Sequence, residues 1–310
     1  MEQIKFGVRL SLIPEYFEKH DFEVIEDYAC ECERLGFDSI WVMDQLLWGE
    51  KGPFECWVAL AALATVTKRI RLGPFVNCNS FRNPALLAKM AATLDRISGG
   101  RLEFGFGAGW YEREFNAYGI PFNDNSTRIK QMKEAIILIK KMWTEEKPSY
   151  KGKYYRISEA ICEPKPIQKP HPPVLIGGRG EKLTLKIVAE LADKSNFLPG
   201  SPEFYRHKLE VLRRHCRQVC RDFDEIVKTW NGDIIIADNK SDVRRKIEKY
   251  KPIKMPLKKY LDENIVGTQN MCIKKLENYI DVGVTYFIPS LRTMRDDLQI
   301  FSEQVMKTFN

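Results

Sequence analysis

Short apolar runs of the kind that form buried strands alternate along the chain with longer segments of helical periodicity. The strand-like runs are Ile4–Leu10, Ser39–Met43, Arg71–Val76, Leu102–Phe106, Val174–Ile176, Ser195–Leu198, Ile226–Ala237 and Val284–Ile288. The helical patterns are Val24–Leu35, Pro53–Thr65, Pro84–Ile97, Arg128–Trp143, Lys182–Leu191, Pro202–Cys220, Asp242–Tyr250 with Met271–Val282, and Met294–Phe309. This alternation predicts parallel strands joined by crossover helices, and eight such units make a (β/α)8 barrel. We therefore expect an α/β fold, a TIM barrel in which residues 1–310 form a single domain.

Two stretches exceed what a bare barrel needs. Residues 144–173 hold six prolines around Tyr150–Ile157, which indicates a hairpin and an extended arm inserted after the fourth helix. Residues 251–270, with Pro252 and Pro256, interrupt the seventh unit. An insertion at the end where strands lead into helices covers the active site, whereas a loop at the opposite end does not. A loop at the opposite end is the simpler assumption for either stretch.

The composition is that of a globular enzyme, with 44% hydrophobic and 29% charged residues. The net charge of +7 is spread along helical segments such as 128–141 and 206–221, which favours solvated helix faces over a nucleic-acid surface. A modest positive field also favours an anionic cofactor or substrate. Residues 57–66, the longest apolar run, are too few to cross a bilayer, and residues 1–10 lack the apolar core of a signal peptide. We expect a cytoplasmic protein that binds neither nucleic acid nor membranes.

The eight cysteines do not have the spacing of a metal site. None forms a Cys-x-x-Cys pair, and only four histidines are present to complete a set of ligands. His215 and Cys216 with Cys220 are the nearest to a cluster, but they lie in a long polar helix that offers no fourth ligand. We expect reduced thiols and no structural metal.

Candidate functional residues follow the predicted strands, because a (β/α)8 barrel places its chemistry at the carboxyl ends of its strands. These residues are Asp44 and Gln45 after the second strand, Asn77 and Cys78 after the third, Ala108, Gly109 and Trp110 after the fourth, Gly177, Gly178, Arg179 and Gly180 after the fifth, and Asn196 after the sixth. Asp44 fits either a cap of the following segment or a site residue.

The two glycine-rich strand ends are the most informative. The segment RLEFGFGAGWYEREF (101–115) is a strand that stops in glycines and turns into a helix, so backbone N–H groups can approach a bound group closely. Residues 177–180 precede a helix, and Arg179 adds positive charge, which favours a phosphate site over an ordinary turn. The strand ends carry no Ser-His-Asp order, no paired carboxylates and no Schiff-base lysine. A cofactor is therefore expected to supply the chemistry.

Several segments resemble the bacterial-luciferase-like superfamily of flavin and deazaflavin oxidoreductases. They are GFDSIWVMDQ (36–45), FRNPALLAKMAATLDRISGGRLEFGFGAGWYEREFNAYGIPF (81–122), the helix that includes Arg128, and KPIQKPHPPVLIGGRGEKLTLKIVAELAD (165–193). Within the superfamily, the chain most resembles the branch that depends on coenzyme F420. The resemblance implies an enzyme with a TIM barrel, an insertion after the fourth helix, a small-molecule substrate and a homodimer. It also implies a non-prolyl cis peptide near Phe75–Val76–Asn77 that supports a ring like isoalloxazine.

Carried over position by position, the resemblance implies contacts with the cofactor. Asp44 and Cys78 match residues beside the deazaflavin, and Ala108 and Gly109 match backbone contacts to it. Residues 177–180 match the loop that holds the cofactor phosphate. Asn77 and Asn196, at neighbouring strand ends, complete the set of cofactor-binding candidates.

Two positions depart from the sugar-phosphate dehydrogenases that resemble this chain. Those relatives have a histidine where Gln45 stands and a catalytic glutamate where Trp110 stands. Glutamine cannot exchange a proton near neutral pH, and the tryptophan indole only donates a hydrogen bond. Sugar-phosphate oxidation is therefore not expected. Gln45 and Trp110 are kept as candidate catalytic residues, and Trp48 is expected to shape an aromatic pocket with Trp110.

Three classes of function stay open. The first is an oxidoreductase that transfers a hydride between F420 and a small organic substrate, and a reductase for a pterin-bound one-carbon unit is a narrower form of it. The second is an FMN-dependent luciferase-like monooxygenase on the same barrel. The third is a barrel that binds a flavin without turnover.

Overall fold

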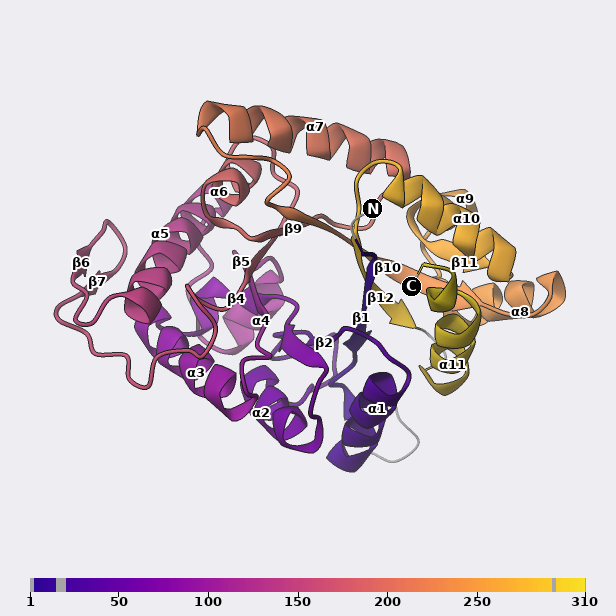
Figure 1. The fold of residues 1–310 in the computed structure, drawn as a ribbon, viewed down its shortest axis with the longest axis horizontal. Coiled ribbons are helices and arrows are strands. Elements are labelled where there is room, and N and C mark those ends of the chain that lie inside the picture. The colour runs from indigo at the N-terminus through magenta and orange to yellow at the C-terminus, as the bar shows by residue number, and fades with distance from the viewer. Residues whose placement is uncertain (1–2, 15–20, 292–293, 310) are drawn as a thin grey trace.

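The computed structural model, which describes residues 3–14, 21–291 and 294–309, is a ring of parallel strands surrounded by helices (Figure 1). The strands of the ring are β1 (Lys5–Leu10), β2 (Ser39–Val42), β3 (Arg71–Pro74), β4 (Asn77–Cys78), β5 (Phe104–Gly107), β8 (Val174–Gly177), β9 (Lys194–Asn196), β10 (Val227–Ile236), β11 (Ile265–Gly267) and β12 (Tyr286–Leu291). Their order is β3-β2-β1-β12-β10-β9-β8-β5-β4, with β11 beside β10.

The third barrel strand is made of two pieces. β3 pairs with β2, and β4 pairs with β5. A bridge between Leu72 and Leu102 brings β3 beside the start of β5, so the sheet nearly closes on itself. The predicted (β/α)8 barrel is confirmed. The predicted strand 71–76 ends at Pro74, before the cis peptide between Phe75 and Val76 that the resemblance implied.

Each predicted helix is present, with ends that differ by a few residues. The helices are α1 (Phe22–Arg34), α2 (Cys56–Val66), α3 (Pro84–Ile97), α4 (Glu112–Ala117), α5 (Asn125–Thr144), α6 (Thr184–Leu191), α7 (Pro202–Gln218), α8 (Lys240–Tyr250), α9 (Leu257–Glu263), α10 (Gln269–Ile280) and α11 (Met294–Gln304), with 3-10 turns η2 (Asn79–Phe81) and η3 (Met306–Thr308). The local sequence explains where several of these helices begin. Asn83 caps α3 and Ser201 caps α7, and in both helices a proline follows at the first position.

The interior of the barrel is filled by side chains. Trp41 and Tyr286 belong to a buried cluster inside the ring. Glu103 is buried between Arg71 and Lys194, with the carboxylate 2.5 Å from a nitrogen of each. Burial acts to raise the pKa of Glu103, but the charges of Lys194 and Arg71 outweigh it and hold that pKa below its ordinary value. The barrel is therefore a packed core, open for chemistry only at its ends.

The two inserted stretches, residues 144–173 and residues 251–270, form different structures. Residues 144–173 contain the predicted hairpin, β6 (Tyr150–Lys151) and β7 (Arg156–Ile157), which Glu134 of α5 anchors by accepting hydrogen bonds from the amides of Lys153 and Tyr154. The seventh-unit insertion forms α9 and β11, two elements that the sequence did not predict. β11 pairs with residues 234–236 at the carboxyl end of β10. The seventh-unit insertion therefore lies on the active-site side of the barrel.

Candidate active site

Val76 packs at the mouth of the barrel against glycines of two neighbouring strands. A Cβ atom on Gly107 would lie 2.7 Å from Cγ2 of Val76, and one on Gly177 would lie 3.2 Å from the same atom. Val76 and its neighbour Phe75 are only half-buried. The mouth thus holds a close-packed seat of one aliphatic side chain and bare backbone. A side chain at either glycine position would press on Val76.

The Asp44 carboxylate is hydrogen-bonded to other groups of the protein. Its carboxylate accepts two hydrogen bonds from Arg82, at 2.8 and 2.9 Å, and a third from the Cys78 amide at 2.9 Å. Burial raises the pKa of Asp44, and the charge of Arg82 opposes the rise. Arg82 also pairs with Glu55. Asp44 therefore ties the second strand end to the third.

Asn77 and Cys78 face the protein interior. The Asn77 side chain accepts a hydrogen bond from the Trp57 indole at 2.7 Å and donates one to the Gly105 carbonyl at 3.0 Å. Burial raises the pKa of the Cys78 thiol to about 12, so it stays protonated near neutral pH. All eight cysteines are free thiols, as the sequence predicted.

The end of the fourth barrel strand, at Gly109, lies against the end of the third, at Cys78. Gly109 has a φ of +78°, and a Cβ atom there would lie 2.6 Å from the Cys78 sulfur, so both the backbone conformation and the space require glycine. Ala108 beside it is half-buried. The backbone of these two residues is therefore accessible from the mouth.

Trp110 and Trp48 form the predicted aromatic pair. Their ring centroids are 6.2 Å apart in an edge-to-face arrangement, and Tyr111 packs against both. Trp110 is 66% exposed and Trp48 is 37% exposed. A cluster of rings this open offers an apolar wall to a ligand rather than a part of the core.

The glycine loop 177–180 precedes α6, whose start has no side-chain cap. The Gly178 amide donates to the Asn196 carbonyl at 2.9 Å. α6 begins at Thr184, and the residue before it, Leu183, provides no side-chain cap. Uncapped amides at a helix start attract anions. Arg179 in the loop is exposed.

Asn196 belongs to a buried polar network. It donates to the Thr229 hydroxyl at 2.7 Å and accepts from the Asn231 amide at 2.8 Å. Its side chain is 5% exposed. The network holds the sixth and seventh strands together beneath the loop that carries Gly178.

Gln45 lies in the short segment after β2, and Glu114 contacts the same segment. The Gln45 side chain is 9% exposed, and its Nε2 atom makes no hydrogen bond with any described residue. Glu114 of α4 accepts hydrogen bonds from the amides of Leu46 and Leu47, and burial raises its pKa. Sequence reasoning missed Glu114 and Arg82. The available signal for Glu114 was its place beside Phe115 on the apolar face of a short helix.

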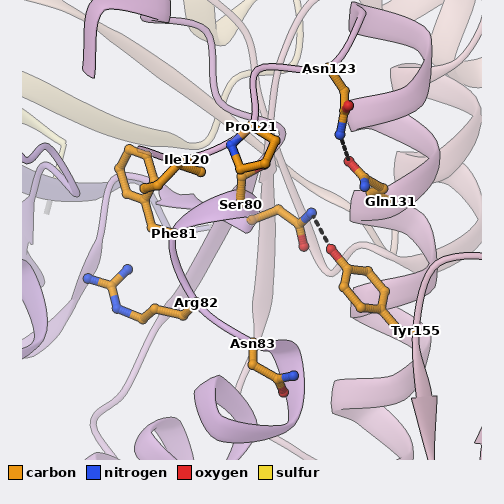
Figure 2. A pocket seen from close by; sticks show the side chains of 10 residues that line it. Ser80, Phe81, Arg82, Asn83, Ile120, Pro121, Asn123, Gln131 and Tyr155 are labelled. Carbon is orange, nitrogen blue, oxygen red and sulfur yellow. Dashed lines mark hydrogen bonds between the residues drawn. The ribbon is translucent and has the colours of Figure 1, made fainter. Parts of the chain in front are cut away.

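Two cavities border the strand ends. One of about 370 Å³ lies at the end of β10 and is lined by Arg9, Arg179, Asp233 and Lys259 among others. The other, of about 270 Å³, lies between the turn after β4 and α5, where Figure 2 shows Gln131 and Tyr155 across from Phe81 and Ile120. Arg179, one of the predicted site residues, lines the first cavity. None of the predicted site residues lines the second.

The sequence profile of the luciferase-like monooxygenase family matches residues 10–286. The chain belongs to this family. The predicted resemblance to flavin and deazaflavin oxidoreductases is confirmed, and with it the prediction of an enzyme. Among the described helices, none combines the length and apolar character that a membrane crossing requires.

Named members of the luciferase-like monooxygenase family use either type of cofactor. An F420-dependent glucose-6-phosphate dehydrogenase of Amycolatopsis mediterranei is 33% identical over 169 residues, which are 53% of this chain and 49% of the relative. An FMNH(2)-dependent dimethylsulfone monooxygenase of Pseudomonas putida is 31% identical over 168 residues, which are 51% of this chain and 44% of the relative. The chain spans about half the length of these curated relatives.

The barrel is also similar to a solved structure over its full length. Coenzyme F420 dependent tetrahydromethanopterin reductase from Methanopyrus kandleri superposes with a TM-score of 0.84 at 20% identity, covering 99% of this chain and 100% of that chain. At this identity the similarity establishes the fold, and function must be argued from the site.

Proposed function

We propose that this chain is an oxidoreductase that transfers a hydride between coenzyme F420 and a small organic substrate. The observation that carries the proposal is the seat at the mouth, where Val76 packs against Gly107 and Gly177. The two glycines give Val76 room to pack against the strand ends, and its half-buried side chain would support a flat tricyclic ring. The relative from Amycolatopsis mediterranei, which is F420-dependent, supports the choice of cofactor.

The residues present fit a phosphorylated ring cofactor. The seat would hold the ring, and the loop 177–180 with Arg179 would hold the phosphate at the uncapped start of α6. Asp44 would act indirectly, because its carboxylate is already bonded to Arg82 and to the Cys78 amide. Bound in this way, F420 would supply two-electron hydride chemistry at the mouth.

The chain's own polar groups offer orientation rather than proton exchange. Gln45 carries a buried amide nitrogen without a hydrogen bond to any described residue, and it would donate to an oxygen of the substrate. Trp110 and Trp48 would exclude water from one side of the site. A substrate whose reaction needs a strong acid or base from the protein is therefore not expected.

An FMN-dependent monooxygenase is the second candidate. The relative from Pseudomonas putida supports it, with an identity to this chain close to that of the F420-dependent relative. Both cofactors need a ring seat and a phosphate loop, so these two features do not separate them. A barrel that binds flavin without turnover is the third candidate, supported by the absence of an acid–base pair at Gln45 and Trp110.

Homodimer formation is part of the proposal. Val58 of α2 and Leu86 and Ile97 of α3 are at least half exposed, with exposed fractions of 71%, 57% and 50%. Large apolar side chains exposed on neighbouring helices are typical of a contact surface. The cytoplasmic location stays a prediction.

A titration of purified protein with F420 and with FMN tests the choice of cofactor. Quenching of tryptophan fluorescence reports binding, because Trp48 and Trp110 border the mouth. We expect F420 to bind more tightly than FMN, and the visible spectrum of the protein as purified gives an independent check. Tighter binding of FMN would instead favour the FMN-dependent monooxygenase or the barrel that binds flavin without turnover.

A further inference from the structure

The smaller cavity, of about 270 Å³ beside η2, has no role in the proposed function. Its lining comes from η2 and the two residues after it, from the segment between α4 and α5, from α5 and from the β6–β7 hairpin. Neither the seat formed by Val76 with Gly107 and Gly177 nor the loop 177–180 contributes to it. Since a water molecule takes up roughly 30 Å³, the cavity has space for about nine waters. That space suits a single ring with one substituent and is too small for a tricyclic cofactor.

The β6–β7 hairpin completes one wall of this cavity. Glu134 of α5 accepts hydrogen bonds from three consecutive amides of the hairpin, at residues 153–155, with distances of 2.9, 2.9 and 3.3 Å. Three amides on one carboxylate fix the hairpin against α5. The hydroxyl of Tyr155 then lies 3.0 Å from Nδ2 of Asn79, from which it accepts a hydrogen bond. The insertion that the sequence predicted after the fourth helix therefore positions a polar group in the cavity.

A buried acceptor without a partner lines the same cavity. Asn79 is only 2% exposed, and its Oδ1 atom accepts no hydrogen bond from any residue that the structure describes. A buried carbonyl without a donor costs free energy, because it has lost its hydrogen bonds to water. A ligand in the cavity that carries an N–H or O–H group would restore the missing bond.

Tyr155 provides a donor next to this acceptor. Its hydroxyl oxygen accepts from Asn79, while its own hydrogen goes to none of the described residues. Burial raises the pKa of Tyr155, so the hydroxyl keeps its hydrogen near neutral pH and can donate it. The cavity thus presents one unused acceptor and one unused donor at the same place.

The lining of the cavity favours a neutral ligand. Among the described residues that line it, Arg82 alone carries a charge. Arg82 donates two hydrogen bonds to Asp44, at 2.8 and 2.9 Å, and also pairs with Glu55. An ionised ligand would lose its hydration here without gaining a free counter-charge, which is unfavourable.

We propose that this cavity is a second binding site, which takes a small neutral ring compound that carries a carboxamide group. The carboxamide N–H would donate to Oδ1 of Asn79, and its carbonyl would accept from the Tyr155 hydroxyl. Phe81 and Ile120 lie across the cavity from Tyr155 (Figure 2) and would pack on the face of the ring. A polyol of the same size has no apolar face to offer them. The site is separate from the cofactor seat, so the inference does not depend on the proposed function.

The test is a calorimetric titration of the purified protein with nicotinamide, a neutral ring carboxamide. We expect a Kd of about 1 mM or tighter, which is typical of a ligand of this size. Nicotinic acid is the matched probe, because it has the same ring but an ionised carboxylate that cannot donate to Asn79. It should bind at least about tenfold more weakly, since it loses a hydrogen bond and is charged.

Variants of the two polar groups locate the binding. Asn79→Leu removes the acceptor at nearly constant volume and should weaken nicotinamide binding by about tenfold. Tyr155→Phe removes the donor and keeps the ring, with an expected loss of about twofold to tenfold. Tyr154→Phe is the matched control, because this neighbouring tyrosine does not line the cavity, and its affinity should equal that of wild type.

A variant that fills the cavity keeps the test decisive if Asn79→Leu does not fold. Ile120→Trp places a large ring at a half-buried position of the lining and should abolish nicotinamide binding. Ile253→Trp makes the same substitution where the side chain is 97% exposed, between α8 and α9, and should bind as wild type does. Thermal unfolding of each variant confirms that the protein tested is folded.

Three results would overturn the inference. They are the absence of saturable nicotinamide binding to wild type, equal affinities for nicotinamide and nicotinic acid, and wild-type affinity in folded Asn79→Leu or Ile120→Trp. A titration in the presence of saturating F420 tests whether the sites are separate. Unchanged affinity supports the second site, whereas competition would place nicotinamide at the mouth and refute it. If F420 does not bind at all, the proposed function fails, while the nicotinamide titrations still decide the inference.

Discussion

The carboxylate of Asp44 and the guanidinium of Arg82 form a two-point ion pair behind the mouth of the barrel, with distances of 2.8 and 2.9 Å. The Asp44 side chain is 1% exposed and that of Arg82 is 11% exposed. A buried pair of this geometry contributes little net stability as a pair, but either partner left alone is costly. The pair therefore fixes the second and third strand ends relative to each other.

Replacing Arg82 with methionine should destabilise the fold. The change leaves the Asp44 carboxylate buried without its counter-charge, and we expect a loss of about 3–5 kcal/mol in the free energy of unfolding. Urea denaturation measures it. Arg113→Met, which breaks an exposed pair with Glu50, is the matched control and should cost much less. Equal losses in the two variants would show that Asp44 is not held by Arg82.

Asp44→Ala separates a structural role from a direct role in binding. If Asp44 acts through Arg82 and the Cys78 amide, thermal stability falls while the affinity of the remaining folded protein for F420 changes little. A direct contact would instead cost about 1–3 kcal/mol of binding energy, the size of a charged hydrogen bond. Parallel titrations of wild type and variant with F420 distinguish the two results.

Gly177→Asp should abolish cofactor binding in a folded protein. The new Cβ would press on Val76, and the carboxylate would repel a phosphate at the neighbouring loop. Gly177→Ala is the control, because it adds the Cβ without the charge and Val76 must move by only a few tenths of an ångström. We expect the alanine variant to retain weakened binding. Wild-type affinity in Gly177→Asp would remove the basis for placing the ring in this seat.

Glucose 6-phosphate should not reduce F420 in the presence of this protein. Gln45 and Trp110 stand where the sugar-phosphate dehydrogenases keep their proton-exchanging residues, and neither can replace them. The double variant Gln45→His with Trp110→Glu should also stay nearly inactive, because a misplacement of about 1 Å can cost about 100-fold in rate. The visible band of F420 reports the reaction. Rapid bleaching by the unmodified protein would contradict this interpretation of the two positions.

Replacing Glu103 with glutamine should make the free energy of unfolding less dependent on pH in acidic solution. The pKa of Glu103 is lowered in the folded protein from its ordinary value of 4.5, so the unfolded chain binds the proton more tightly. Its contribution is therefore complete above pH 4.5 and is lost as the pH falls through the lower folded pKa. Urea midpoints of wild type and variant should differ most near pH 7 and converge in acid. Glu112→Gln, at an exposed position on α4, should follow wild type throughout.

Val58→Asp should dissociate the proposed homodimer if α2 and α3 form its interface. A carboxylate in the centre of an apolar contact is desolvated without a partner, which costs several kcal/mol. Sedimentation velocity gives the mass of each species. A monomeric wild type, or a variant that stays dimeric, would exclude this surface as the interface.

The sequence was sufficient for the barrel because each unit repeats a local pattern, a short apolar run followed by an amphipathic helix. It also placed Gly109 and Trp110 at the mouth, since strand ends follow directly from strand positions. It did not reveal the pairing of Asp44 with Arg82, because Asp44 follows β2 and Arg82 follows the turn after β4, and only the folded barrel brings them together. The short elements α9 and β11 were missed for a similar reason. A three-residue strand has no period of its own and exists because β10 offers an unpaired end.

Val76 and the glycines it covers behave as one steric unit distributed over three strands. Val76 already occupies the space that the absent side chains of Gly107 and Gly177 leave, so a larger residue at position 76 would not fit. A side chain at either glycine would in turn require a smaller residue at position 76. Substitutions at these positions are therefore expected to covary among homologues. Engineering of the barrel for a bulkier ring would have to alter all three together, and single-site libraries at the mouth would overlook the solutions.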